Sequence, residues 1–423
     1  MKVLFVSEYW EPHGQGGGEI SAAMLAKALA KHGVDVHVLT SAFPGALIYE
    51  RKEGLVIHRK LATANSPTGL LNNLKRMLTF PRSVRHEVKK LLAHERFDIV
   101  HYFNTTSALG APKTDVPQLV HVNSPVFFCP KGTLMYQDKK ECHYDCTPTR
   151  FLRCFVKSHE FGKTHNAWYY KWNPVVWFLL YASWRKRLHV LKSFPHVTPN
   201  SAFMDEKLHE VNVPNERITI VPNVVLIGKQ TAASSRQTNT VPRILYAGTF
   251  IESKGILDIL NALKDITQPY TCDLIGDGPL KQTMLNLVAK NHLANVHVRD
   301  PIPHEELLTR LHAYDIIVQP SHVAEAMPRA VLEALAAGKV VVTSNVGGAK
   351  GVIRHGENGV LYDPYLQGAL RKAIDTVLVD PLLRKNLSAR APDTVKPMSE
   401  KAVANDVVKL YERLLAAKAP SPT

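Results

Sequence analysis

Long apolar runs are scarce in this sequence of 423 residues. The longest candidate, PVVWFLLYASW at 174–184, falls well short of the ~20 apolar residues that a membrane-spanning helix requires. The first ten residues, MKVLFVSEYW, place only four apolar residues together before a serine, which predicts a buried strand and not the apolar core of a signal peptide. We therefore expect a cytoplasmic protein, either soluble or peripheral to a membrane.

Acidic side chains are also in short supply, with 37 Asp and Glu against 52 Lys and Arg, a formal net charge of +15. Such a surplus predicts an acidic partner: a nucleic acid, an anionic lipid surface or a phosphorylated substrate. No recognised nucleic-acid-binding motif is present, so we expect no nucleic-acid partner. The basic residues gather in two stretches, 71–97 and 167–192, and the second also holds four of the five tryptophans.

These two basic stretches combine cations with large apolar side chains. Trp and Tyr beside Lys and Arg suit a bilayer interface, where the rings lie at headgroup level and the cations meet anionic lipid. The pattern predicts an anionic membrane surface as a partner, with the protein peripheral on the inner face of the cell membrane. The alternative is a buried aromatic helix followed by a solvated basic turn, Arg185 to Arg187.

Two nucleotide-binding fingerprints, GxGxxG and GxxxxGK[ST], are missing. Short apolar runs do alternate with helical patterns along both halves of the chain. The runs are VLFVS, VDVHVLT, FDIVHYF and PQLVHVN in the first half, and RILYAGT, CDLIGDG, DIIVQPS and VVVTSN in the second. Apolar strands separated by helices predict parallel sheets covered on both faces, and hence an α/β fold with two doubly wound domains.

The domain boundary is predicted from a polar stretch, GKQTAASSRQTNTV at 228–241, which has no periodicity and is typical of a linker. We therefore expect an N-terminal domain over residues 1–227 and a C-terminal domain over residues 228–395. The last segment, 396–423, is predicted to be a helix that packs back toward the N-terminal domain.

Glycine-rich segments follow three of the predicted strands: PHGQGGGE, AGTFIESKG and IGDGP. Ligands of open α/β sheets bind at such loops, outside the carboxyl ends of the strands. Glycine lets backbone N–H groups approach an anion closely, and Lys254 adds a positive charge. Tight turns alone would explain each segment, but their recurrence at corresponding places in two domains favours an anion site in the cleft between them.

Two glutamates stand eight positions apart in SHVAEAMPRAVLEALAAG, residues 321–338. Pro328 suits the first turn of a helix, which would leave Glu325 in the preceding loop and place Glu333 one to two turns inside. A helix N-terminus attracts phosphate, and carboxylates beside it indicate a polyhydroxy ligand or a cation. The alternative is an acidic helix cap followed by a surface glutamate.

Taken together, these motifs resemble the retaining glycosyltransferases of family 4, which have the GT-B fold. Two Rossmann-like doubly wound domains face a central cleft in that fold. The matching segments are GGGE, FDIVH, VPN, AGTFIESKG, LIGDGP and the long block from PSHVAEAMPRAVLEALAAG to NGVLYDP. They span nearly the whole chain, and the last block is the most specific.

The resemblance implies a role for each matching residue. Glu325 matches the glutamate that faces the donor sugar near the anomeric centre, and Glu333 matches the glutamate that binds the donor ribose. Lys254 matches the lysine that neutralises the leaving diphosphate, which implies catalysis without a catalytic metal. The donor would be a nucleotide-diphosphate sugar, and the remaining donor-binding residues would be Gly16, Gly17, Gly248, Thr249, Ala326, Met327, Arg329 and Ala330.

Two positions depart from the family pattern. The family usually has Arg after the glycine of the first loop in its second domain, whereas Thr249 follows Gly248 here, so one cation for the diphosphate is missing or supplied elsewhere. The family often has His after the PQLVHV-like strand, where this chain has Asn123. That histidine contacts the donor sugar, and the Asn123 amide can also hydrogen-bond a hydroxyl on the acceptor or donor-sugar side.

Cysteine is rare outside one segment, because four of the five cysteines lie between residues 129 and 154. In a cytoplasmic chain these four predict a structural zinc site inserted in the N-terminal domain, with His143 as an alternative ligand. Free cysteines, a disulfide or an iron–sulfur cluster are the other interpretations. The four are Cys129, Cys142, Cys146 and Cys154.

Three functions fit these observations. The first is a retaining glycosyltransferase that moves a sugar from a nucleotide-diphosphate donor to a glycan or lipid-linked acceptor, in cell-surface polysaccharide or glycolipid biosynthesis. The second is a nucleotide-sugar epimerase or hydrolase of the same fold, which the glutamate pair disfavours. The third is a donor-binding protein with a decayed site. The departures at Thr249 and Asn123 suggest this function, but it is disfavoured because Lys254, Glu325 and Glu333 are intact.

Overall fold

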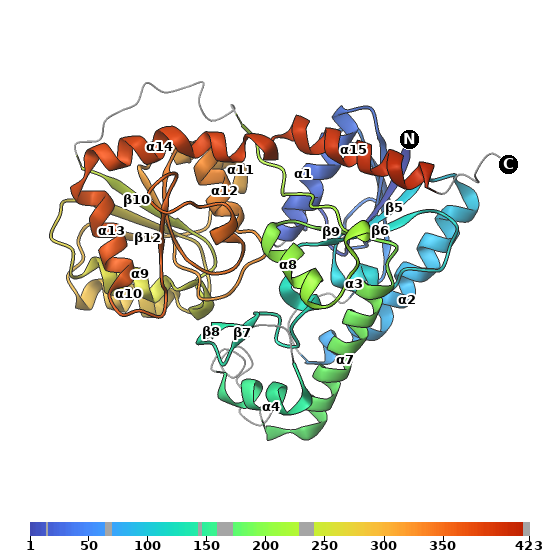
Figure 1. The fold of residues 1–423 in the computed structure, drawn as a ribbon, viewed down its shortest axis with the longest axis horizontal. Coiled ribbons are helices and arrows are strands. Elements are labelled where there is room, and N and C mark those ends of the chain that lie inside the picture. The colour runs from blue at the N-terminus through green and yellow to red at the C-terminus, as the bar shows by residue number, and fades with distance from the viewer. Residues whose placement is uncertain (14–15, 64–69, 143–145, 159–171, 228–240, 418–423) are drawn as a thin grey trace.

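The computed structural model describes residues 1–13, 16–63, 70–142, 146–158, 172–227 and 241–417. Most of the predicted linker, His143 and the first residues of the second basic stretch lie outside these described residues. The described chain forms two α/β domains, each built on a sheet with helices around it (Figure 1). None of the helices in the described ranges is both long enough and apolar enough to cross a membrane.

The N-terminal domain contains a seven-stranded sheet in the order β3-β4-β2-β1-β5-β6-β9, parallel except for the β3–β4 pair. The chain adds strands on both sides of β1, with β2, β4 and β3 on one side and β5, β6 and β9 on the other, which is the doubly wound arrangement that the sequence predicted. The strands are β1 (Lys2–Val6), β2 (Asp35–Ser41), β3 (Tyr49–Lys52), β4 (Leu55–Leu61), β5 (Ile99–Tyr102), β6 (Gln118–Val122) and β9 (His196–Pro199).

The unbroken apolar run of β1 has a direct structural reason. Val3 and Phe5 belong to the core beneath α1 (Gly17–Lys31), whereas Leu4 and Val6 belong to the core beneath α2 (Leu70–His94). Successive side chains of a strand point to opposite faces of the sheet, so a sheet that helices cover on both faces needs apolar residues at every position. The other helices of this domain are α3 (Thr105–Ala108), α4 (Pro148–Lys157), α7 (Pro174–Ser193) and α8 (Ala202–Glu210).

The C-terminal domain repeats this plan with six parallel strands in the order β12-β11-β10-β13-β14-β15. The predicted pair of doubly wound α/β domains is therefore confirmed, although β3, β4, β9, β12 and β15 were not anticipated. The strands are β10 (Arg243–Ala247), β11 (Thr271–Ile275), β12 (Val296–Arg299), β13 (Ile316–Gln319), β14 (Val340–Ser344) and β15 (Val360–Tyr362). The helices are α9 (Ile256–Leu263), α10 (Lys281–Lys290), α11 (His304–Arg310), α12 (Arg329–Ala336), α13 (Ala369–Val379) and α14 (Pro381–Val395).

The last helix, α15 (Glu400–Ala416), leaves the C-terminal domain and lies along α1 of the N-terminal domain (Figure 1). Val403, Val407 and Leu410 are buried in the core beneath α1. The Tyr411 hydroxyl lies 2.8 Å from Nδ1 of His101 on β5. In structural terms α15 therefore belongs to the N-terminal domain.

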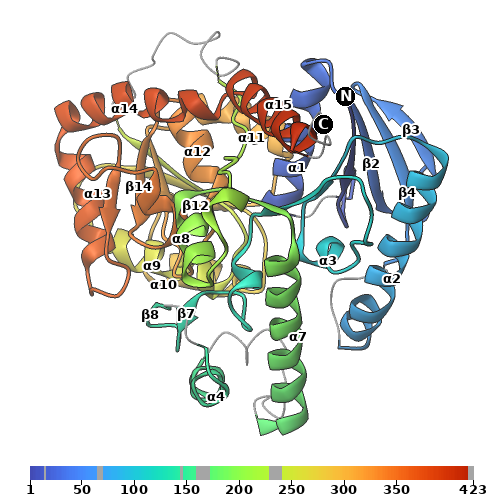
Figure 2. The ribbon, with the colours of Figure 1, turned by 45° about the vertical axis from the view of Figure 1, so that its right-hand side comes forward.

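Between β6 and α7, the described residues 123–142 and 146–158 form a small substructure. It contains the hairpin β7 (Met135–Tyr136) and β8 (Lys140–Glu141), followed by α4. The hairpin lies between the two domains, whereas α7 extends away from the body of the N-terminal domain (Figures 1 and 2). This substructure corresponds to the cysteine-rich insert that the sequence predicted at 129–154.

Candidate active site

A cleft of about 800 Å³ opens between the two domains, at the carboxyl ends of both parallel sheets. Loops after β1 and β6 form its N-terminal wall, and loops after β10, β11 and β13 form its C-terminal wall. The predicted residues that line it are Gly17, Asn123, Gly248, Thr249, Lys254, Glu325, Ala326, Met327, Arg329, Ala330 and Glu333. Gly16 is the residue before α1 and does not itself line the cleft.

Lys254 and Glu325, from two different loops, meet in this cleft. Lys254 ends a short turn after β10, Glu325 lies in the loop after β13, and the Lys254 Nζ lies 2.8 Å from Oε2 of Glu325. The loops are held together at Gly255, whose φ is +66° and where a Cβ atom would lie 2.0 Å from the Pro320 carbonyl oxygen. Only glycine fits there, so the close approach of the two loops explains why the motif ends in Lys-Gly.

A pair of glycines supports the loop that carries Glu325. The Gly348 N–H donates to the Glu325 carbonyl at 2.8 Å. A Cβ on Gly347 would lie 2.5 Å from that same carbonyl oxygen, and a Cβ on Gly348 would lie 2.0 Å from the Ala326 carbonyl oxygen. The Gly-Gly of SNVGGAK therefore lets a second backbone segment pack directly behind the glutamate.

Glu333 is buried at the opposite end of this wall. Its Oε1 accepts hydrogen bonds from Arg329 at 2.7 Å and from Nε2 of His304 at 2.9 Å. Burial alone would raise the pKa of Glu333, but the His304 hydrogen bond and the Arg329 charge hold it below its ordinary value. An ionised acceptor at the cleft wall is suited to binding hydroxyl groups.

The helix that carries Glu333 begins one residue later than the sequence suggested. Pro328 was expected in the first helical turn, but its ψ of 112° is extended, and α12 begins at Arg329. Glu325 lies in the loop before the helix and Glu333 one turn inside it, as the pattern predicted. In the described structure, the N–H groups of Ala326, Met327, Arg329 and Ala330 donate no backbone hydrogen bond, because they precede or open the helix.

Arg329 also connects the two domains. Its guanidinium lies 3.2 Å from Oγ of Ser21 and 2.9 Å from Sδ of Met24, both on α1. A second link is the Ser201 hydroxyl, which donates to the Ala326 carbonyl at 2.6 Å. Both links end on the segment between the two glutamates, so the position of that segment depends on the N-terminal domain.

The two positions that depart from the family pattern both lie in the cleft. The Asn123 amide nitrogen donates to the Phe103 carbonyl at 3.3 Å and lies close to Gly18. The Thr249 carbonyl accepts from the Tyr246 hydroxyl at 3.0 Å. Of the described residues that line the cleft, the lysines and arginines are Lys254 and Arg329.

Several cleft residues were not anticipated from the sequence. His304 holds Glu333 but belongs to no recognisable motif, and its only signal is its position as the first residue of α11, the helix after β12. Gly132 and Thr133 come from the cysteine-rich insert, Asn200 follows β9, and Asn223 is the last residue of the VPN motif. Sequence reasoning treated the insert as a separate structural unit and so missed that it reaches the cleft.

Comparison with known proteins identifies the family. The model of Glycosyltransferase Family 4 matches residues 15–226, half of the chain, and the model of Glycosyl transferases group 1 matches residues 229–394. The protein belongs to glycosyltransferase family 4. This confirms the predicted family.

Curated relatives of this family 4 protein cover it to different extents. An uncharacterised glycosyltransferase of Methanocaldococcus jannaschii is 29% identical over 40% of this chain and 48% of its own length. Glycogen synthase of Mycobacterium tuberculosis is 31% identical over 43% of this chain and 45% of its own length. The chain therefore spans about half the length of these two relatives. A lipopolysaccharide core biosynthesis glycosyltransferase of Rhizobium meliloti is 25% identical over 55% of this chain and 67% of its own length.

Solved structures show the same fold over nearly the whole chain. Sucrose-phosphate synthase of Thermosynechococcus elongatus is 20% identical, with a TM-score of 0.71, over 98% of this chain and 99% of that one. HepE of Anabaena, in complex with UDP and glucose, is 18% identical, with a TM-score of 0.69, over 98% of this chain and 100% of that one. At these identities the likeness concerns the fold.

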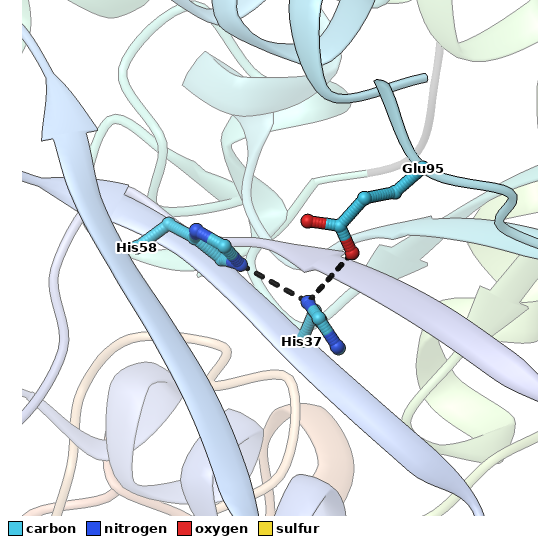
Figure 3. A group of neighbouring side chains, drawn as sticks. All are labelled: His37, His58 and Glu95. Atoms are coloured by element: carbon cyan, nitrogen blue, oxygen red, sulfur yellow. Dashed lines mark hydrogen bonds and ion pairs between the residues drawn. The ribbon is translucent and has the colours of Figure 1, made fainter. Parts of the chain in front are cut away.

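A cluster of ligand-type side chains lies away from the cleft, in the first half of the N-terminal sheet (Figure 3). His37 Nδ1 lies 3.0 Å from Nε2 of His58 and 3.8 Å from Oε2 of Glu95. That same Glu95 oxygen is 2.7 Å from the Lys2 ammonium, which would repel a metal ion. A metal on Nε2 of His58 would also need a hydrogen on its Nδ1, which is buried without a partner in the described structure.

The cluster is therefore better explained as a hydrogen-bonded network. Burial lowers the pKa of both histidines, that of His58 to about 4, so each ring is neutral near pH 7. A neutral His58 can donate from Nε2 to Nδ1 of His37, and no charge is then left unpaired in the core.

Proposed function

We propose that the protein is a retaining glycosyltransferase that transfers a sugar from a nucleotide-diphosphate donor to a glycan or lipid-linked acceptor. The observation that carries this proposal is the cleft itself, which presents the Lys254–Glu325 pair and the Arg329–Glu333 pair around one helix N-terminus. Relatives named for lipopolysaccharide core and teichuronic acid biosynthesis support a role in making cell-surface polysaccharide or glycolipid.

The cleft supplies the charges that such a donor requires. The donor diphosphate would lie at the start of α12, where the unpaired backbone N–H groups and the helix dipole favour an anion. Glu333 would accept from the ribose hydroxyls. Its ionised state suits this role, because a diol offers two donors to a carboxylate.

Catalysis would rest on Lys254. When the bond between sugar and diphosphate breaks, negative charge grows on the leaving phosphate and positive charge grows at the anomeric carbon. The Lys254 ammonium stabilises the first of these charges, and the Glu325 carboxylate lies where it can stabilise the second. Because these groups and the helix amides supply the required charges, we propose that no catalytic metal takes part.

A panel of nucleotide sugars, each with and without acceptor glycans, tests this proposal. Transfer with retention of the anomeric configuration supports it. Interconversion of nucleotide sugars would instead identify an epimerase, and release of the sugar to water that no acceptor suppresses would identify a hydrolase. Binding without turnover would indicate a donor-binding protein in which Thr249 and Asn123 mark a decayed site.

The acceptor is proposed to lie at an anionic membrane surface. Met77 and Leu78 on α2 are about half exposed, at 48% and 58%, and Phe178 on α7 is 70% exposed. A groove of about 220 Å³ joins the two helices, and the cations that line it are Arg82, Arg85 and Lys186. Exposed apolar side chains beside cations match the chemistry of an anionic bilayer surface.

The two halves of α7 support different interpretations of this helix. Its second half is buried through Trp184, Leu188 and Leu191, whereas its first half is exposed. Arg187 does not belong to the exposed basic surface, because it donates to the Val126 carbonyl at 3.1 Å and burial lowers its pKa to about 10. Arg185 and Lys186 are exposed, so the basic turn would offer two cations to a membrane and not three.

A further inference from the structure

The β7–β8 hairpin of the cysteine-rich insert lies between the two domains and ends at Glu141 (Figure 1). The Glu141 side chain is only 17% exposed. Its Oε2 accepts from the Gly347 N–H at 3.3 Å and lies 2.9 Å from the Lys350 ammonium. Its Oε1 lies 3.0 Å from the same ammonium. A carboxylate of the insert is therefore bound at two points to the turn at 347–351 of the C-terminal domain.

The turn that Glu141 binds lies directly behind Glu325. The Gly348 N–H donates to the Glu325 carbonyl at 2.8 Å, and a Cβ on Gly347 would lie 2.5 Å from that carbonyl oxygen. Two backbone segments packed this closely leave no room for independent movement, so a displacement of the turn would displace the Glu325 loop as well.

The turn and the Glu325 loop also contact the body of the N-terminal domain. The Lys350 ammonium lies 5.7 Å from the centre of the Phe203 ring on α8. Ala324 and Ala326, on either side of Glu325, are buried in the N-terminal core. Apolar packing of this kind has no preferred direction, whereas a hydrogen bond to a carboxylate does. The contacts of Glu141 therefore add directional precision to the placement of the turn.

The hairpin that carries Glu141 is itself held within the insert. The Lys131 side chain is only 3% exposed, and its ammonium lies 2.8 Å from Asp138 at the hairpin tip. The Ser158 hydroxyl, which follows α4, donates to the same carboxylate at 2.9 Å. A side chain can fix the position of its partner only if its own backbone is held, and these contacts meet that condition.

One cysteine of the insert also holds the hairpin. The Gln137 N–H donates to Sγ of Cys154 at 3.3 Å, and the Cys154 thiol donates to the Met135 carbonyl at 3.7 Å. Cys154 thus connects α4 to the hairpin through its sulfur. Within the described ranges, no three of the four cysteine sulfurs of the insert lie within 4.8 Å of one another. The zinc ligation predicted from the sequence for these cysteines therefore stays a prediction.

We propose that Glu141 is a positioning residue for the sugar transfer, because it fixes the turn on which the backbone of Glu325 rests. Glu141 itself does not line the cleft. The inference rests on the function proposed above, in which the Glu325 carboxylate stabilises charge at the anomeric carbon. A misplacement of about 1 Å in a reacting group costs on the order of a hundredfold in rate. Glu141 should therefore act on kcat and leave donor affinity to the residues that line the cleft.

The first test is steady-state kinetics on substitutions that separate the two contacts of Glu141. Glu141→Ala removes both and should lower kcat at least about tenfold, with the donor KM within about twofold of wild type. Glu141→Gln keeps an oxygen for the Gly347 N–H, and Lys350→Met keeps the carboxylate, so each should lose no more than about threefold. The matched control is Lys140→Ala, an exposed neighbour on β8 that should behave as wild type.

Three kinetic results would overturn the proposal. The first is a kcat within about twofold of wild type in Glu141→Ala. The second is a donor KM that rises as much as kcat falls, which would show that the insert shapes the donor site. The third is an equal loss in Glu141→Ala and Glu141→Gln, which would assign the effect to the charge of the side chain and not to its hydrogen bond with Gly347.

The second test is amide hydrogen exchange of the protein without substrates, resolved to single residues by mass spectrometry. Glu141→Ala should speed exchange at Gly347, which loses its acceptor, and also at Gly348 and Glu325, whose N–H groups donate to the Glu325 and Val323 carbonyls. Glu141→Gln and Lys140→Ala should leave all three unchanged.

This second test does not depend on turnover, so it separates the role of Glu141 from the proposed function. Faster exchange at Gly347 alone would show that the contact is local, and would overturn the proposal even if sugar transfer were confirmed. Faster exchange at all three amides in a protein that transfers no sugar would support the link between the insert and the Glu325 loop, and it would contradict the proposed function instead.

Discussion

Replacing Lys254 by alanine removes the ammonium that lies 2.8 Å from Glu325 in the cleft. A unit charge about 4 Å from a developing phosphate charge is worth about 4 kcal/mol at the effective dielectric of a protein surface. Since 1.4 kcal/mol corresponds to a tenfold change in rate, the upper limit of the loss is about a thousandfold. Water entering the space left by the side chain would recover part of this, so we expect kcat to fall at least about a hundredfold.

The same substitution should have little effect on folding. Both side chains of the pair are about one quarter exposed, at 28% and 26%, and pairs near the surface contribute at most about 1 kcal/mol to stability. Urea unfolding should therefore give a free energy within about 1 kcal/mol of wild type. A loss of activity at unchanged stability would place the effect of Lys254 in the reaction.

The assay measures initial rates of sugar transfer with the donor that the panel identifies. Glu325→Ala should cause a comparable loss, and the double variant should lose much less than the product of the two single losses, because the residues act as a unit. Lys281→Ala is the matched control, since Lys281 also pairs with a carboxylate, Asp300, but does not line the cleft. Wild-type turnover in both Lys254→Ala and Glu325→Ala would refute the assignment of the site.

Three further outcomes are expected. Glu333→Ala should raise the KM for the donor more than it lowers kcat, measured by steady-state kinetics. His304→Ala, which removes a hydrogen-bond partner of Glu333, should have the same effect to a smaller degree. The protein should sediment with anionic liposomes at low salt but hardly with neutral ones. The double variant Arg85→Ser, Lys186→Ser should bind anionic liposomes more weakly. Equal sedimentation with both liposome types would favour a soluble acceptor. Burial holds the pKa of His58 near 4 in the folded protein, below its value in the unfolded chain. Below about pH 6.5 the unfolded chain therefore takes up a proton that the folded protein does not, and the free energy of unfolding decreases as the pH falls toward 4. His58→Leu should therefore reduce the acid-induced loss of unfolding free energy by up to about 3 kcal/mol over that interval.

Local sequence patterns were enough to predict the plan of the fold. The apolar runs mark strands buried on both faces, and glycines mark loops where backbone approaches backbone, as at Gly255 and Gly348. The edge strands β3 and β12 were missed because partial exposure breaks their apolar pattern. Their pairing depends on partners far along the chain, which a local pattern does not reveal.

The candidate site was predictable only in part. Glu325 and Glu333 stand in one continuous motif, so the chain itself places them near each other. His304, Ser21 and Glu141 act through contacts with residues at least 29 positions away. No short window contains both members of such a pair, and the approach of the two domains brings them together.

Because α15 packs on the N-terminal domain, it determines which fragments of the chain can fold on their own. A fragment ending at residue 227 would contain all seven strands of its sheet but would lack Val403, Val407 and Leu410, leaving an apolar channel open along α1. Each of those side chains contributes roughly 1.5–3 kcal/mol when buried, which is a large part of the stability of an average domain. Expression of the N-terminal half alone should therefore yield aggregated material, and co-expression of residues 396–423 as a separate peptide should restore a soluble half-protein.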